Sequence, residues 1–229
     1  MRLILFDIDG TLVWTRGAGR EATRRAMIEV FGTCGALDGH KFGGKTDWQT
    51  LIELLAEIGE IEPHMPAYNA AMERQLTAII DQYDVQPCPG ALDLIEALRQ
   101  REDVALGLVT GNVSGTAPIK LRAAGFDPTW FPVGAYGSEA LERDKLPALA
   151  LARACEHYRC PFTPQQVIVV GDTPADVSSA RALGALAVAV QTGFTTADEL
   201  AAARPDYLLR DLTEFSLILG DAPSFPPAR

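Results

Sequence analysis

The sequence has 229 residues, of which 48% are hydrophobic and 22% are charged, a composition typical of a globular protein and not of a disordered or collagen-like chain. Twenty Lys and Arg against thirty Asp and Glu give a net charge of −10. The sequence has no long run of basic residues that could bind along a phosphate backbone, so we expect no nucleic-acid partner. The apolar stretches fall short of the about 18 residues that a membrane span requires, and no secretory leader is recognisable, which predicts a cytoplasmic protein with no membrane partner.

Short runs of β-forming residues alternate with helical patterns along most of the chain. Four runs are apolar on both faces, as buried parallel strands are, and they lie at residues 2–6, 104–109, 167–170 and 186–190. Residues 207–209 are a candidate fifth strand. Helical spacing separates them at residues 91–98, 118–124 and 146–150. This alternation predicts an α/β fold with a doubly wound, mostly parallel sheet.

The interval from Val13 to Gln86 breaks the alternation, because it contains three helical patterns and no convincing strand. Its apolar stripes lie near residues 22–30, 48–58 and 65–76. We interpret each stripe as the core of a helical insertion in preference to a ligand-binding surface.

The position of this insertion predicts two domains. A Rossmann-like core takes residues 1–13 and 87–229, and a smaller all-helical domain takes residues 14–86. The stiff segment Pro87–Gly90 suits the foot of a movable lid. We expect the tail from residue 220 to 229 to be loosely ordered.

The first predicted strand runs directly into Asp7-Ile8-Asp9-Gly10. Open α/β sheets bind ligands beyond the carboxyl ends of their strands. A turn led by Gly10 lets Asp7 and Asp9 converge on one small volume, which is costly without a cation. The alternative is that both acids only form a turn, as most Asp-Gly pairs do.

Two further strand ends carry polar, glycine-containing turns, Thr110-Gly111-Asn112 and Gly171 to Asp176. Asp172 and Asp176 can join Asp7 around a hard cation, and carboxylates with retained waters suit Mg²⁺. The Thr110 hydroxyl and its neighbouring backbone N–H groups can cradle an anion, with Lys145 as countercharge. Taken singly, Thr110 is more often a strand-end cap and Lys145 a surface lysine.

Four motifs together resemble those of the haloacid dehalogenase superfamily of hydrolases, in its phosphatase branch. They are DIDGTL at residues 7–12, VTGN at 109–112, Lys145 followed by Leu146-Pro147, and VVGDTPAD at 169–176. The helical insertion between the first two resembles the C1-type cap of phosphoglycolate-phosphatase-like and β-phosphoglucomutase-like members.

The resemblance implies a Mg²⁺-dependent phosphatase acting on a small phosphorylated metabolite through an aspartyl-phosphate. Asp7 would be the nucleophile and Asp9 the acid and base, with the Asp9 backbone carbonyl also on the metal. The metal ligands implied are Asp7, Asp9 and Asp172, with Asp176 either as a further ligand or as a group that orients the ligands. The groups implied to bind the transferring phosphoryl oxygens are Thr110, Gly111, Asn112 and Lys145.

Two features of these motifs qualify the resemblance. Relatives that cleave carbon–halogen or carbon–phosphorus bonds lack the second acid, so the presence of Asp9 indicates a leaving oxygen that needs a proton. Leu146 stands between Lys145 and Pro147, a departure from the usual Lys-Pro pair, which leaves Lys120 as an alternative cation.

The predicted cap carries a glycine-rich segment, Phe42 to Asp47, that leads into a helix. Because such a loop dips toward the active site in relatives, Lys45 is a candidate for contact with the far end of the substrate, and a solvated loop lysine is the alternative. Arg16 and Arg20 are candidates to add positive charge, with helix-surface positions the favoured interpretation.

Two other functions stay open from the sequence. A phosphomutase would form the same aspartyl-phosphate and transfer it to a sugar. A receiver-like phospho-switch also uses Asp, Thr, Lys and Mg²⁺, but receivers are about half this length, order these residues differently and carry no cap. We expect a monomer or a homodimer.

Overall fold

The apolar runs form one parallel sheet. The structure is a computed structural model that describes residues 1–219, and the tail predicted to be loosely ordered lies outside these residues. The sheet has six strands in the order β5-β4-β1-β6-β7-β8, and every adjacent pair is parallel. The strands are β1 (Arg2–Phe6), β4 (Val104–Thr110), β5 (Val133–Tyr136), β6 (Val167–Gly171), β7 (Leu186–Val190) and β8 (Tyr207–Leu209).

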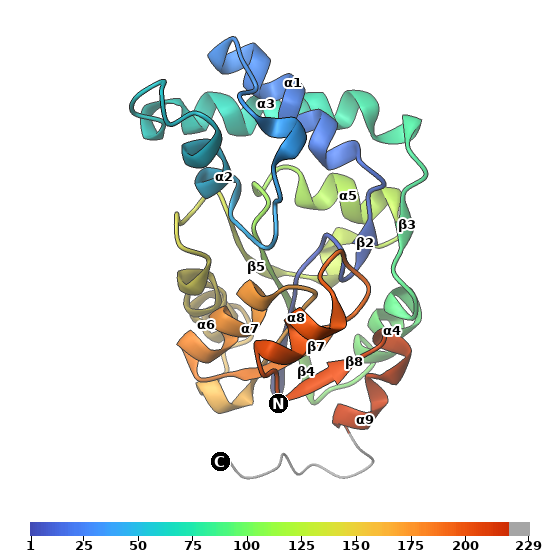
Figure 1. Cartoon of the computed structure of the whole chain (residues 1–229). Coiled ribbons are helices and arrows are strands. Elements are labelled where there is room, and N and C mark those ends of the chain that lie inside the picture. The colour runs from blue at the N-terminus through green and yellow to red at the C-terminus, as the bar shows by residue number, and fades with distance from the viewer. Residues whose placement is uncertain (220–229) are drawn as a thin grey trace.

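Helices cover both faces of this sheet (Figure 1). They are α4 (Ala91–Leu98), α5 (Ala117–Ala123), α6 (Leu146–His157), α7 (Pro174–Leu183), α8 (Ala197–Ala202) and α9 (Ser216–Leu219). Alternate residues of β1 point to opposite faces. Ile4 and Phe6 join the core under α4 and α5, whereas Leu3 and Leu5 join the core under α6 and α7. The predicted doubly wound α/β fold is therefore confirmed.

The helical insertion forms its own layer above the carboxyl ends of the strands (Figure 1). It consists of α1 (Ala18–Phe31), α2 (Asp47–Leu54) and α3 (Met65–Ile79). A separate hydrophobic core joins these helices, in which Ala22 and Ala26 of α1 lie with Tyr68 and Met72 of α3. The predicted all-helical character of the insertion is confirmed.

The chain enters and leaves this layer through a short antiparallel ribbon of β2 (Val13–Trp14) and β3 (Gln86–Pro87). The sequence did not indicate these strands, because two residues are too few to show a period. The predicted domain boundaries fall within the ribbon, and the division into two domains stays a prediction.

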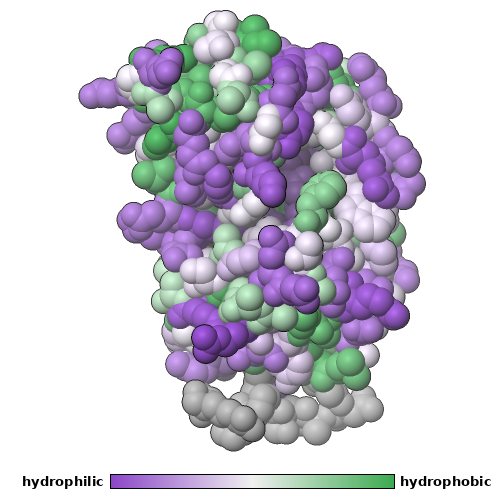
Figure 2. All heavy atoms as spheres, viewed as in Figure 1, coloured by the Kyte–Doolittle hydropathy of each residue, from purple (hydrophilic) through white to green (hydrophobic). Residues whose placement is uncertain are grey.

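The face of the described chain that carries the helical layer at its top in Figure 2 is largely polar. Hydrophilic residues cover most of the face shown in Figure 2. Among residues 1–219, no helix has the length and apolar character needed to cross a membrane.

Candidate active site

Three neighbouring strands bring the predicted site residues to one edge of the sheet. In the register of the sheet, Phe6 of β1 lies beside Leu108 of β4 and Val170 of β6. The turns that follow these three strands therefore start side by side. They carry Asp7 and Asp9 after β1, Thr110 to Asn112 at the end of β4, and Asp172 after β6.

Three carboxylates form a buried cluster at this edge. One carboxylate oxygen of each of Asp7, Asp172 and Asp176 lies within 4.8 Å of the other two. Their side chains are almost fully buried. Gly10, at φ +82°, permits this approach, because a Cβ atom there would lie 2.6 Å from Asp172 Oδ2.

Burial and mutual repulsion disfavour the charged forms of Asp7 and Asp172. The pKa of Asp7 is raised from 3.8 to about 6, because burial and the nearby charges of Asp176 and Asp9 together outweigh the lowering effect of Arg143. Burial, Asp7 and Asp176 raise the pKa of Asp172 well above its usual range. Oxygen donors that repel one another in this way fit a hard divalent cation, so the residues present suit the expected Mg²⁺.

A buried arginine that the sequence analysis did not single out lies against the cluster. Arg143 begins a 3-10 turn at Arg143–Lys145, just before α6. Its Nη2 lies 3.1 Å from Asp7 Oδ1 and pairs with Asp176, and its Nη1 donates to the Gly44 carbonyl at 3.0 Å. Its Nε is buried and has no hydrogen-bond partner within residues 1–219.

The structure does not bring Lys145 to the cluster. Its side chain is 65% exposed and pairs with the equally exposed Glu142. Because of the 3-10 turn, the side chains of Arg143 and Lys145 point in different directions. The buried cation at the cluster is therefore Arg143. The signal present in the sequence was a second cation, Arg143, two residues before Lys145.

Asp9 belongs to a separate network with Lys120, the alternative cation. Lys120 Nζ lies 2.6 Å from Asp9 Oδ2 and 2.6 Å from Asn112 Oδ1. Asn112 Nδ2 donates to the same Asp9 oxygen at 2.7 Å and to Thr110 Oγ1 at 2.8 Å. Within residues 1–219, Asp9 Oδ1 accepts only a longer bond, 3.3 Å, from the Thr15 hydroxyl.

The glycine-rich segment of the helical layer is bonded to the turn after β4. The backbone N–H of Asp47 donates to the Gly111 carbonyl at 2.8 Å, and Asp47 Oδ2 accepts from the Val113 N–H at 2.9 Å. A Cβ atom at Gly111 would overlap the Lys45 carbonyl, so this packing requires glycine. The segment therefore lies directly over the site.

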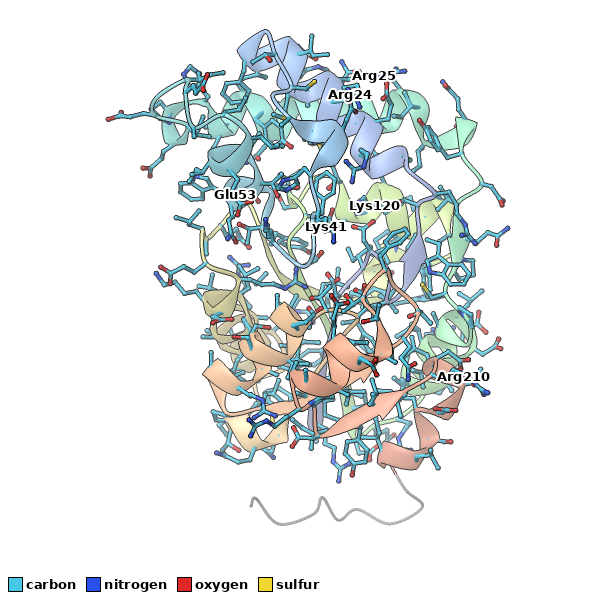
Figure 3. The ribbon with its side chains drawn as sticks, in the orientation of Figure 1. Arg24, Arg25, Lys41, Glu53, Lys120 and Arg210 are labelled. Carbon is cyan, nitrogen blue, oxygen red and sulfur yellow. The ribbon has the colours of Figure 1, made fainter. Side chains whose placement is uncertain are left out.

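The three basic residues considered for the cap have other partners here. Lys45 pairs with Glu53 of α2, which Figure 3 labels on the helical layer. Arg16 stacks over the Trp14 ring at 4.5 Å. Arg20 donates to the carbonyls of Leu37 and His40, which gives it a structural role in the loop before α2. A substrate contact by Lys45 stays a prediction.

Comparison with known proteins identifies the family. Residues 1–184 match the haloacid dehalogenase-like hydrolase family. The chain is 30% identical over 210 residues to a phosphoglycolate phosphatase of Synechococcus elongatus, covering 91% of this chain and 92% of that protein. It is 23% identical to the pyrophosphatase PpaX of Oceanobacillus iheyensis, covering 97% and 98% of the two chains.

A solved structure agrees with this assignment at the level of the fold. A hydrolase from Pseudomonas syringae superposes with a TM-score of 0.74 at 22% identity, covering 98% of this chain and 100% of that one. The chain belongs to the haloacid dehalogenase-like hydrolase family, and the resemblance drawn from the four motifs is confirmed.

The raised pKa of Asp7 predicts how pH changes the stability of the metal-free protein. Because the folded-state pKa of about 6 exceeds the ordinary value of 3.8, protonation of Asp7 stabilises the fold. That contribution is complete below about pH 4 and is lost as the pH rises through about 6. In the presence of a chelator, we expect the Tm of the wild type to fall relative to that of Asp7→Asn between about pH 4.5 and 7.5.

Added Mg²⁺ should reverse this loss. It competes with protons for the same oxygens, so the rise in Tm should be larger at pH 7.5 than at pH 5. Thermal unfolding at both pH values, with and without Mg²⁺, measures the effect. A Tm difference between wild type and Asp7→Asn that does not change with pH would contradict this interpretation of the cluster.

Proposed function

We propose that this haloacid dehalogenase-like hydrolase is a Mg²⁺-dependent phosphatase that cleaves a small phosphorylated metabolite through an aspartyl-phosphate at Asp7. The observation that carries the proposal is the cluster of Asp7, Asp172 and Asp176 beside the buried guanidinium of Arg143. The names of the two relatives support a phosphorylated substrate and do not agree on which one.

The cluster has the donors that a metal ion needs in this reaction. Asp7, Asp172 and Asp176 would hold Mg²⁺, with the Asp9 carbonyl as a further oxygen. When bound, the ion supplies positive charge that offsets the repulsion between the Asp7 carboxylate and a phosphate dianion.

Asp7 and Asp9 divide the chemistry between them. A carboxylate oxygen of Asp7 attacks phosphorus, the bond to the leaving oxygen breaks, and Asp9 gives that oxygen its proton. Water then attacks the aspartyl-phosphate, Asp9 takes the proton back, and inorganic phosphate leaves with the Asp7 carboxylate restored. Asp9 therefore has to reach the leaving oxygen in the first step and the water in the second.

The remaining polar groups suit the transferring phosphoryl oxygens. Thr110 Oγ1 accepts from Asn112, so its own hydrogen is left to donate. The Nε of Arg143 is buried without an acceptor in the described chain, which is a costly arrangement unless an anion binds there. Phosphoryl transfer depends mainly on such positioning and charge stabilisation.

The helical layer would act as the cap of this active site. Its segment over Gly111 restricts the space for the leaving group, and closure would keep water from the site until the aspartyl-phosphate has formed. We take residues 14–86 as this cap and the remaining residues as the catalytic core.

The direct test of this function is hydrolysis of 4-nitrophenyl phosphate with and without Mg²⁺. We expect release of inorganic phosphate that stops when the metal is chelated and returns when it is added back. Asp7→Asn keeps the shape of the side chain and removes the nucleophile, so kcat should fall about 10³-fold or more. Activity that survives both changes would contradict the proposal, and isomerisation of a sugar phosphate without phosphate release would favour the mutase.

A matched pair of variants tests which cation serves the site. Arg143→Met should lower kcat/KM about 10²-fold to 10³-fold, as expected for loss of one donor to the transferring group. Lys145→Met replaces an exposed lysine by the same residue. Its kcat/KM should stay within about twofold of the wild-type value, as expected for a surface charge. The reverse ranking would return this role to Lys145.

A further inference from the structure

A second buried cation lies beside the active site, separate from Arg143. Lys120 comes from α5, its side chain is 4% exposed, and it lies between the helical layer and the sheet in Figure 3. Burying an ammonium group is costly unless it is paired and hydrogen-bonded. The partners of Lys120 therefore indicate what this lysine is for.

Lys120 and Asn112 bind the same oxygen of Asp9. Lys120 Nζ lies 2.6 Å from Asp9 Oδ2, Asn112 Nδ2 lies 2.7 Å from it, and Lys120 also donates to Asn112 Oδ1 at 2.6 Å. The three side chains form a closed ring in which Oδ2 has two nitrogen donors. In the described part of the chain, Oδ1 has a single hydrogen bond, from Thr15 at 3.3 Å, so it is the oxygen left to exchange a proton.

The cap also meets Lys120. A Cβ atom at Gly19 of α1 would lie 3.4 Å from Lys120 Nζ, so this helix covers the lysine. Burial raises the pKa of Asp47 to about 6. The positive charge of Lys120 is the largest influence that acts in the opposite direction. The same ammonium group thus lies near the acid–base carboxylate of the core and a buried carboxylate of the cap.

We propose that Lys120 is a positioning residue for Asp9: together with Asn112 it holds Oδ2 and leaves Oδ1 to serve the leaving oxygen and then the water. This inference rests on the proposed phosphatase function and adds a residue to it. A lysine that instead contacted the phosphoryl oxygens would stabilise the transferring group whatever the leaving group. The two roles therefore predict different losses of kcat/KM when Lys120 is removed: a loss that varies with the leaving group for a positioning residue, and a constant loss for a phosphoryl contact.

Two aryl phosphates of similar shape separate these roles. Phenolate is a more basic leaving group than 4-nitrophenolate and depends more on a proton from Asp9. The quantity to measure is kcat/KM, because it reports transfer to Asp7 and not the later hydrolysis. For Lys120→Met, we expect a fall of about 10²-fold with phenyl phosphate and of less than about tenfold with 4-nitrophenyl phosphate.

The ratio of the two kcat/KM values on one preparation cancels the fraction of folded enzyme. Arg122→Met, on the exposed side of the same helix, is the matched control and should leave both values unchanged. Lys120→Gln, which keeps a hydrogen-bond donor, replaces the Met variant if that variant does not fold, and we expect a change in the same direction.

A double-mutant cycle completes the test. In an Asp9→Asn background, Lys120→Met should lower kcat/KM for phenyl phosphate by less than about threefold, because residues that act as a unit are not additive. The inference would be overturned if Lys120→Met lowered kcat/KM equally for both substrates. It would also be overturned if Lys120→Met lowered kcat/KM as much in the Asp9→Asn background as in the wild type. If the wild type cleaves neither substrate with Mg²⁺, the proposed function itself fails, and the inference fails with it.

Discussion

Mutual repulsion among three buried carboxylates is the constraint on which this site depends. One carboxylate oxygen of each of Asp7, Asp172 and Asp176 lies within 4.8 Å of the other two at the edge of the sheet, where burial opposes the charged forms of Asp7 and Asp172. A fold retains such an arrangement when positive charge compensates it. Arg143 supplies part of that charge, and the oxygen-only donor set suits a divalent ion for the rest.

The parallel sheet explains how distant residues reach this one place. Asp7 and Asp172 follow β1 and β6, which are neighbours in the sheet, and Thr110 ends β4 on the other side of β1. The cap is then bonded to the same turns, through Asp47 at Gly111 and Val113. Under the proposed function, a movement of this helical layer would act directly on the groups that would bind the phosphoryl oxygens.

The sequence was sufficient for the features that have long or distinctive patterns, namely the five apolar strands, the helical insertion and the acids at the strand ends. It was insufficient where a short turn decides the direction of a side chain. Arg143 and Lys145 are two residues apart, but only the former is buried, and Lys45 turns toward Glu53. The strand β5 is only four residues long and contains Gly134, so its pattern was too weak to predict.

The central claim is that Asp7 becomes covalently phosphorylated in this cluster. Rapid acid quenching during turnover of 4-nitrophenyl phosphate with Mg²⁺, followed by borohydride reduction and peptide mass spectrometry, tests it directly. The account predicts that residue 7 is recovered as homoserine, the reduction product of an aspartyl-phosphate, and only when both substrate and metal are present. Modification at Asp172 instead, or steady release of phosphate with residue 7 always recovered as aspartate, would contradict it.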